Sequence, residues 1–123
     1  MGATNSIDIV PNAHIHICKS IQDNSCTIID KINKLFTITV TDTQLSMIER
    51  ENIIKSCNVF VFVYSDTSIN SHLQNIEIDI ATRNYKPIVG FNHSKSVLKI
   101  NNTIYSNVDE LCDYIYSSYG NQN

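Results

Sequence analysis

The chain has 123 residues, a hydrophobic content of 42% and a formal net charge of −3 at pH 7. This length suits one compact domain with its own core and is too short for two. A weak negative charge without a dense Lys/Arg cluster argues against nucleic-acid binding through a basic face. No apolar run approaches the roughly 20 residues that a membrane-spanning helix needs.

We expect a single domain over residues 13–119, with residues 1–12 and 120–123 as tails. The first residues lack the basic segment and apolar core of a secretory signal, so we expect a cytoplasmic location. The four cysteines form no C-x-x-C pair. In such a compartment they are expected to be reduced and mostly buried thiols.

The predicted elements alternate between strands and helices. Residues 13–18 (AHIHIC) read as a strand, and residues 25–35 have the apolar spacing of an amphipathic helix. A second strand is predicted over residues 36–41 (FTITVT), and a second helix over residues 45–57. Residues 59–64 (VFVFVY) are continuously apolar. That pattern is typical of a strand buried on both faces of a parallel sheet.

The next segment, SHLQNIEIDIATRNYKP over residues 71–87, has two interpretations. Isoleucines alternate with acids over residues 76–80, which is the period of a strand. At helical spacing, Leu73, Glu77 and Ile80 instead share one face. Glu77 then lies in the middle of an apolar stripe, where an ionised carboxylate needs a partner or a function.

The following elements favour the helix. Residues 86–91 (KPIVGF) form another buried strand, and two parallel strands need a crossover of a dozen or more residues between them. A short edge strand at residues 103–104 and a helix over residues 108–119, capped by Asn107, complete the chain. This alternation predicts a doubly wound α/β domain.

Glu77 would stand near the carboxyl ends of the strands, because the crossover helix begins where the third strand ends. Ligands of doubly wound sheets bind in the crevice at that edge. The loops of this edge carry further polar residues, namely Asp23, Asp42, Ser65 and Ser68. Glu77 is therefore either a working carboxylate in the crevice or a side chain that reaches water or caps a loop.

His14 and His16 point to one face of the first predicted strand and are candidate metal ligands. No third ligand follows at a telling spacing, so histidines of the sheet face are the better interpretation and we expect no metal.

The stretch from Tyr64 to Phe91 resembles the third strand, crossover helix and fourth strand of a TIR (Toll/interleukin-1 receptor-like) domain in a small stand-alone form. The matching positions are Ser65, Asn70, Ser71, Glu77, Ile78, Ala81, Lys86 and Pro87. The first strand agrees more weakly, with Asp23 at the acidic position of its loop. Asp42 resembles the acid that opens the loop after the second strand.

The resemblance implies a flavodoxin-like fold with a mostly parallel sheet of about five strands and helices on both faces. Many TIR domains cleave NAD⁺ between nicotinamide and ribose, and their catalytic glutamate falls on Glu77. A fixed carboxylate there stabilises the positive charge that develops on the ribose carbon. The product would be ADP-ribose or a cyclic form, serving immune defence. NAD⁺ would be the substrate, with no separate cofactor.

The same resemblance assigns substrate contacts to Ser20, Asp23, Asp42, Ser65 and Leu73, and a homo-oligomer through TIR–TIR contacts. Leu73 stands where the family has tryptophan, so a stacking surface for the base is missing. The loop after Asp42 is short and has no glycine. Two alternatives therefore stay open: a non-catalytic TIR interaction or adaptor module, and an enzyme resembling nucleoside deoxyribosyltransferases with Glu77 as nucleophile.

Overall fold

The computed structural model describes residues 13–21, 26–65, 71–92, 104–105 and 107–119. The predicted tails, residues 1–12 and 120–123, lie outside these ranges, as do Asp23 and Ser68. The elements in chain order are β1 (His14–Cys18), α1 (Cys26–Asn33), β2 (Thr37–Val40), α2 (Met47–Ser56), β3 (Val59–Tyr64), α3 (His72–Arg83), β4 (Ile88–Asn92), β5 (Ile104–Tyr105) and α4 (Val108–Tyr119).

The five strands form one sheet in the order β2-β1-β3-β4-β5. Every neighbouring pair is parallel. This order is that of flavodoxin-like doubly wound folds, and it confirms the predicted fold class.

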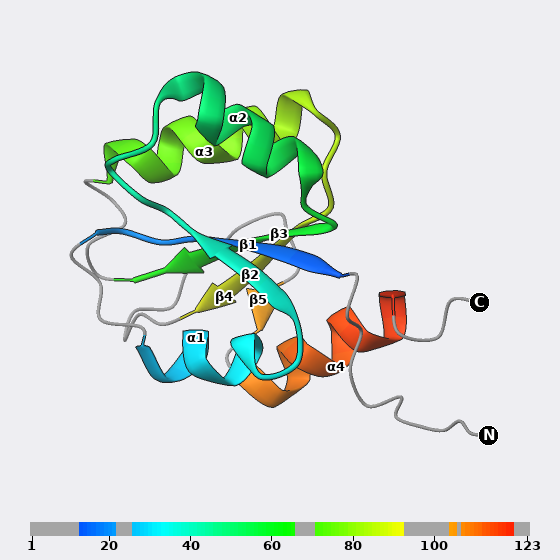
Figure 1. Cartoon of the computed structure of the whole chain (residues 1–123). Helices are drawn as coiled ribbons and strands as arrows, with labels where there is room; N and C mark the ends of the chain where they lie inside the picture. The colour runs from blue at the N-terminus through cyan, green and yellow to red at the C-terminus, as the bar shows by residue number, and fades with distance from the viewer. Residues whose placement is uncertain (1–12, 22–25, 66–70, 93–103, 106, 120–123) are drawn as a thin grey trace.

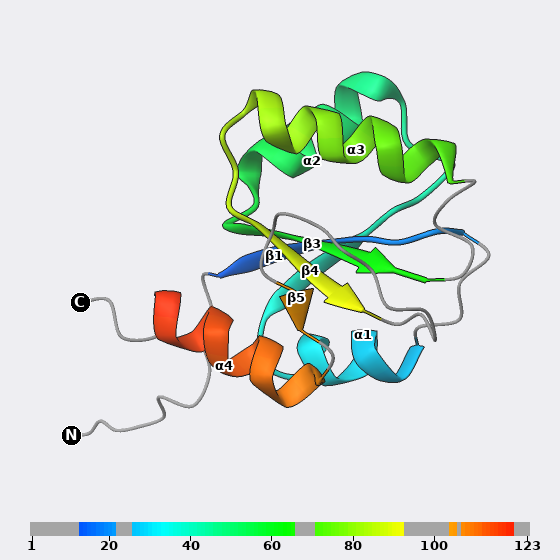
Figure 2. The ribbon, with the colours of Figure 1, turned by 180° about the vertical axis from the view of Figure 1, so that it is seen from behind.

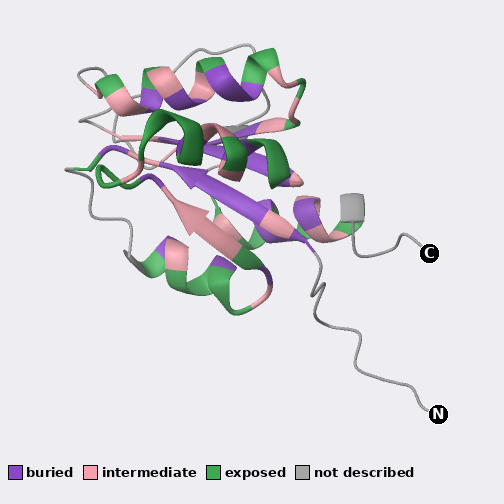
Figure 3. Cartoon of the chain, turned by 45° about the horizontal axis from the view of Figure 1, so that its top comes forward, coloured by how far each residue is buried: buried purple, intermediate pink, exposed green. Residues whose placement is uncertain are grey.

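Helices cover both faces of the sheet in three layers. α2 and α3 lie side by side on one face, and α1 and α4 lie on the other, as the two opposite views show (Figures 1 and 2). β3 is buried along five of its six residues (Figure 3). Its alternate side chains enter two separate cores, with Val61 in the core under α1 and α4 and Phe60 in the core under α2 and α3. The continuous apolar run therefore marks a central strand, as predicted.

The disputed segment is a helix. α3 begins after Ser71, whose side chain accepts a hydrogen bond from the backbone N–H of Gln74 at 3.4 Å. It ends at Arg83, before the cap Asn84. The alternation of isoleucines with acids is overridden by the need to connect two parallel neighbours, β3 and β4.

α2 starts later than predicted, and its buried face includes a charged residue. It begins at Met47 because Ser46 and Glu49 form a reciprocal capping box, with bonds of 3.0 and 3.1 Å. Ile48, an apolar residue of the predicted helix, is 75% exposed, while Arg50 is buried. Arg50 shares the buried face of α2 with Ile54, and Ile48, two positions earlier, lies on nearly the opposite side of the helix.

Candidate functional site: a buried carboxylate between four elements

Glu77 lies inside the protein and not on an open surface. Its exposed fraction is 0%, and it faces the sheet from the second turn of α3. Arg50 of α2 and His16 of β1 are also buried, at 2% and 0% exposure, and Thr41, directly after β2, is 6% exposed. Four segments that are distant in sequence thus bring charged and polar side chains to one point between the sheet and the α2–α3 layer.

Both carboxylate oxygens of Glu77 accept hydrogen bonds. Thr41 Oγ1 donates to Oε1 at 2.6 Å, and His16 Nε2 lies 2.9 Å from the same oxygen. Arg50 Nη1 donates to Oε2 at 2.8 Å and forms a buried ion pair. Burying a charged group costs several kcal/mol of desolvation free energy per ion. Together these contacts offset that cost for the carboxylate and the guanidinium.

The Arg50 guanidinium also holds the loop between β2 and α2. Its Nη2 donates to the backbone carbonyls of Asp42 and Leu45, both at 3.0 Å. A rigid guanidinium can make these three bonds at once, whereas a lysine ammonium could not match the geometry. The Arg50 side chain therefore both holds this loop in position and balances the negative charge of Glu77.

Two histidines extend the network along β1. His16 Nδ1 and His14 Nε2 both lie 2.8 Å from the hydroxyl oxygen of Thr39. An ionised carboxylate only accepts, so His16 Nε2 carries the proton shared with Glu77, and in the neutral ring Nδ1 accepts from Thr39. The hydroxyl oxygen then accepts from His14. The two rings expected as sheet-face histidines are thus linked to each other and to Glu77.

The network holds the pKa of Glu77 below its ordinary value. Burial alone raises this pKa, but the hydrogen bond and the electrostatic interaction with His16, with the bonds from Thr41 and Arg50, outweigh it. A carboxyl group whose pKa is lower in the folded chain stabilises folding above its unfolded pKa and loses that contribution as the pH falls. We expect urea unfolding to show stability falling below about pH 4.5, and Glu77→Gln to flatten that part of the profile.

Burial lowers the pKa of His14, and the nearby His16 and Lys86 lower it further. A hydrogen bond to the backbone of Ser56 acts in the opposite direction and raises it. The unfolded chain therefore binds a proton on His14 more readily than the folded chain does, so stability drops as the pH falls through about 6.5. We expect His14→Gln to reduce the slope of unfolding free energy between pH 7 and 5.5. An unchanged slope in this variant would contradict the assignment.

The other residues predicted to contact the substrate differ in their burial. Ser20 is buried, whereas Ser65 and Leu73 are partly exposed. The Asp42 carboxylate is exposed and accepts the backbone N–H of Gln44 at 2.8 Å, so it caps its own turn. Asp23 lies outside the described residues.

Sequence reasoning missed Arg50, Thr41 and His16 as partners of Glu77. One signal was available: Arg50 precedes Ile54 by four residues, which places the two on one face of a helix.

Cys18, Cys57 and Cys112 are free and buried, as expected for structural thiols, and the side chain of Cys26 lies outside the described part. Burial raises the pKa of Cys18 well above its ordinary value and that of Cys57 to about 11. Thiols of this kind are poor nucleophiles. Among the described residues no group of three or more His, Cys, Asp or Glu side chains is placed to hold a metal ion.

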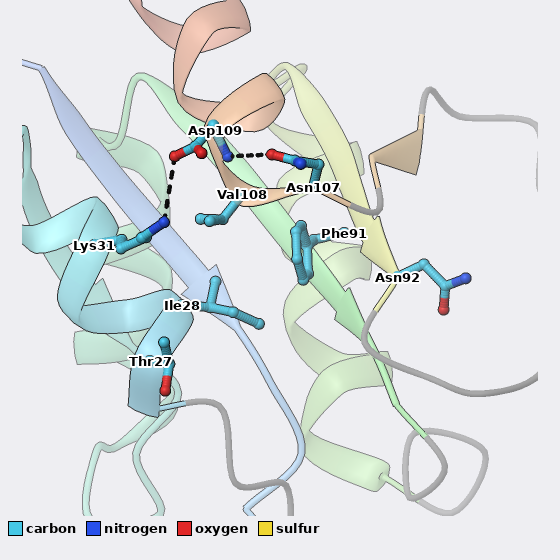
Figure 4. A pocket seen from close by; sticks show the side chains of 8 residues that line it. All are labelled: Thr27, Ile28, Lys31, Phe91, Asn92, Asn107, Val108 and Asp109. Carbon is cyan, nitrogen blue, oxygen red and sulfur yellow. Dashed lines mark hydrogen bonds and ion pairs between the residues drawn. The ribbon is translucent and has the colours of Figure 1, made fainter.

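A pocket of about 410 Å³ lies on the opposite face of the sheet from Glu77 (Figure 4). Its lining comes from α1, the end of β4 and the start of α4: Thr27, Ile28, Lys31, Phe91, Asn92, Asn107, Val108 and Asp109. Lys31 Nζ and Asp109 lie 3.4 Å apart across it, and Asn107 Oδ1 accepts the backbone N–H of Asp109 at 2.8 Å as the predicted cap of α4. The pocket contains no part of the Glu77 network.

The strand order and the two helical layers define a flavodoxin-like α/β protein. No family model and no curated protein matches the chain. Among solved structures, it is similar to a crystal structure of CapF with the inhibitor 3-isopropenyl-tropolone, at 21% identity and a TM-score of 0.44. The alignment covers 89% of this chain and 29% of that one, so this chain spans less than a third of CapF's length. Within the described ranges, no helix is long and apolar enough to cross a membrane.

Proposed function

We propose that this chain is a protein-interaction module of the TIR type, in which Glu77 is a structural anion and does not cleave NAD⁺. The proposal depends above all on the burial of the Glu77 carboxylate and on its hydrogen bonds to other side chains of the protein. Glu77 is 0% exposed and its two oxygens accept from three protein side chains. A ribose hydroxyl or an oxocarbenium-like carbon needs one of those oxygens at hydrogen-bonding distance.

The exposed apolar side chains support an interaction role. In the described part of the chain, Met47, Ile48 and Tyr85 belong to the α2–α3 layer and are 52%, 75% and 93% exposed. Aromatic and methionine side chains are enriched in protein interfaces. Leu73, at the position of the family's tryptophan, removes the aromatic surface on which a base would stack.

The second candidate is an NAD⁺ glycohydrolase or cyclase with Glu77 as the catalytic carboxylate. One observation favours it: the lowered pKa keeps Glu77 ionised, on the crossover helix at the sheet edge where ligands of this fold bind. Turnover would require Arg50 to leave Oε2. The binding of NAD⁺ and the separation of this ion pair would then have to occur together.

One assay separates the two. Protein at low and at high concentration is incubated with NAD⁺, and nicotinamide is followed by chromatography. We expect no release above the protein-free rate at any concentration. Release that disappears in Glu77→Gln and persists in Asp79→Asn would overturn the proposal and establish the enzyme. Asp79 is the matched control, because it is an acid of the same helix with a side chain that is 71% exposed.

A further inference from the structure

The pocket between α1 and α4 is used neither by the proposed function nor by its alternative. It measures about 410 Å³. Pockets that bind small molecules usually measure about 300–1,000 Å³, so this size suits one small ligand. The lining comes from the end of β4 and from the first turns of α1 and α4 (Figure 4). It therefore lies at the carboxyl edge of the parallel sheet, where doubly wound proteins bind their ligands.

The floor of the pocket is apolar. Phe91 and Ile28 are 4% and 8% exposed, and both belong to the core that packs under α1 and α4. Val108, at the start of α4, is partly buried and packs against the same core. A ligand in the pocket would meet one aromatic ring and two aliphatic side chains. The apolar surface that it covered there would leave water, which favours binding.

The rim of the pocket carries one cation and one anion side by side. Lys31 Nζ of α1 lies 3.4 Å from Asp109 Oδ1 of α4, and the two side chains are 48% and 76% exposed. Asn107 accepts the backbone N–H of Asp109 at 2.8 Å and caps α4, which fixes the place of Asp109 on the rim. An ion pair as exposed as this one stabilises the fold little. A ligand can therefore separate the two side chains at small cost.

Two opposite charges so close together select against a ligand with a single charge. An anion that Lys31 attracts is repelled by Asp109 from nearly the same distance, and a cation meets the reverse, so the two energies nearly cancel. A zwitterion pairs with both. An α-amino acid carries its carboxylate and its ammonium on one carbon, which matches a cation and an anion that lie 3.4 Å apart.

The side chain of such a ligand has a place to lie. It leaves the same carbon as the two charged groups, in a third direction. In Figure 4 the Lys31–Asp109 pair lies on one side of the pocket and the Phe91 ring on the other, with Ile28 and Val108 between them. The charged rim and the apolar floor thus match the two parts of one small molecule.

We propose that this pocket binds a free α-amino acid with a large apolar or aromatic side chain. The ligand carboxylate accepts from Lys31 Nζ, and the ligand ammonium donates to the carboxylate of Asp109. The ligand side chain covers Phe91, Ile28 and Val108. One ion pair between α1 and α4 is replaced by two, so the ligand bridges the two helices. This inference concerns the face of the sheet opposite to Glu77 and does not depend on the proposed interaction function.

The first test is a titration with L-phenylalanine, followed by nuclear magnetic resonance spectroscopy of the protein. A ligand of this size in a suitable pocket should bind with a Kd of about 0.1–1 mM. Phenylpropionate lacks the ammonium, phenethylamine lacks the carboxylate, and glycine lacks the side chain. Each should bind at least about tenfold more weakly, because one attachment is lost. D-Phenylalanine places the three groups as a mirror image and should lose a similar factor.

The second test uses variants of the rim. Lys31→Gln and Asp109→Asn should each weaken the binding of L-phenylalanine at least about tenfold. Lys31→Gln should bind phenethylamine more tightly than the wild type does, because the repelling cation is gone, and Asp109→Asn should do the same for phenylpropionate. A purely structural link between the helices would not produce this exchange of preference.

Lys34→Gln and Asp113→Asn are the matched controls. They make the same changes at exposed residues, one directly after α1 and one a turn further along α4, and neither residue lines the pocket. Both should bind L-phenylalanine as the wild type does. The melting temperatures of the rim variants should stay within about 2 °C of the wild type, because the exposed pair contributes little to stability.

Three results would overturn the inference. The first is no saturable binding of L-phenylalanine up to about 10 mM. The second is equal binding of L-phenylalanine, its mirror image and its singly charged analogues, which would indicate a merely apolar pocket. The third is undiminished binding in both rim variants, which would place the ligand elsewhere. None of these measurements involves NAD⁺, so failure of this inference is distinguishable from failure of the proposed function.

Discussion

Replacing Arg50 with methionine should destabilise the fold by about 3–5 kcal/mol, measured by urea unfolding at pH 7. Methionine fills much of the same volume but leaves the Glu77 carboxylate buried without its cation. It also removes the two bonds to the carbonyls of Asp42 and Leu45. Arg50→Lys should fall between wild type and methionine, because an ammonium restores charge without the planar geometry.

The double variant Arg50→Met/Glu77→Gln tests whether this loss is one of charge pairing. Glutamine keeps an oxygen that can accept from Thr41 and His16, while both charges are gone. We expect the double variant to be more stable than Arg50→Met alone, since neutralising both members of a buried pair is milder than breaking it. Effects of the two substitutions that add within about 0.5 kcal/mol would show no coupling and contradict the ion-pair assignment.

Phe60→Ala should destabilise the fold by about 3–5 kcal/mol. Phe60 is fully buried in the central strand β3, and its ring centroid lies 5.6 Å from that of His16. The substitution therefore opens a cavity directly beside the Glu77 network. Phe62→Ala is the matched control. Phe62 points to the same core but contacts Tyr64, with ring centroids 4.5 Å apart and the ring planes tilted by 46°.

Both phenylalanine variants should lose comparable unfolding free energy in urea. Only Phe60→Ala should also shift the ring resonances of His16 in nuclear magnetic resonance spectra. Equal shifts in the two variants would mean that Phe60 does not support the network in particular.

The buried network gives Glu77 a role that needs no substrate. It joins β1, the end of β2, α2 and α3 through a carboxylate whose acceptor sites are used by Thr41, His16 and Arg50. Hydrogen bonds of a buried polar cluster rigidify its surroundings, and of the Arg50 nitrogens only Nε has no hydrogen-bond partner.

Much of the fold was predictable because it depends on short-range pattern. β3 and α4 have the predicted bounds, and the other elements differ at their ends by a few residues. A continuous apolar run indicates a strand buried on both faces, and a crossover of fixed minimum length indicates a helix between parallel strands. These rules use local composition and chain connectivity, and neither requires knowledge of a distant partner.

The site depends on contacts that these rules do not contain. Arg50 and Glu77 are 27 residues apart, and His16 and Glu77 are 61 apart. Their meeting is decided by which face of α2 packs against the sheet, and that face holds Arg50 and Ile54. A shift of one residue in a helix turns a side chain by about 100°. Ile48 lies two positions before Arg50 and so on nearly the opposite side of α2. Local spacing did not show which of these two sides is buried, and Arg50 was missed for that reason.

The sequence by itself determined the order of strands and helices along the chain, the parallel sheet and the place of Glu77 on the apolar face of the crossover helix, since periodicity and connectivity act locally along the chain. Only the tertiary structure decided that this carboxylate is buried and hydrogen-bonded to Arg50, Thr41 and His16. It also decided that the side chains of Met47, Ile48 and Tyr85 are exposed at the surface. Burial and pairing depend on how whole helices rotate and pack, and that is a property of the assembled layers.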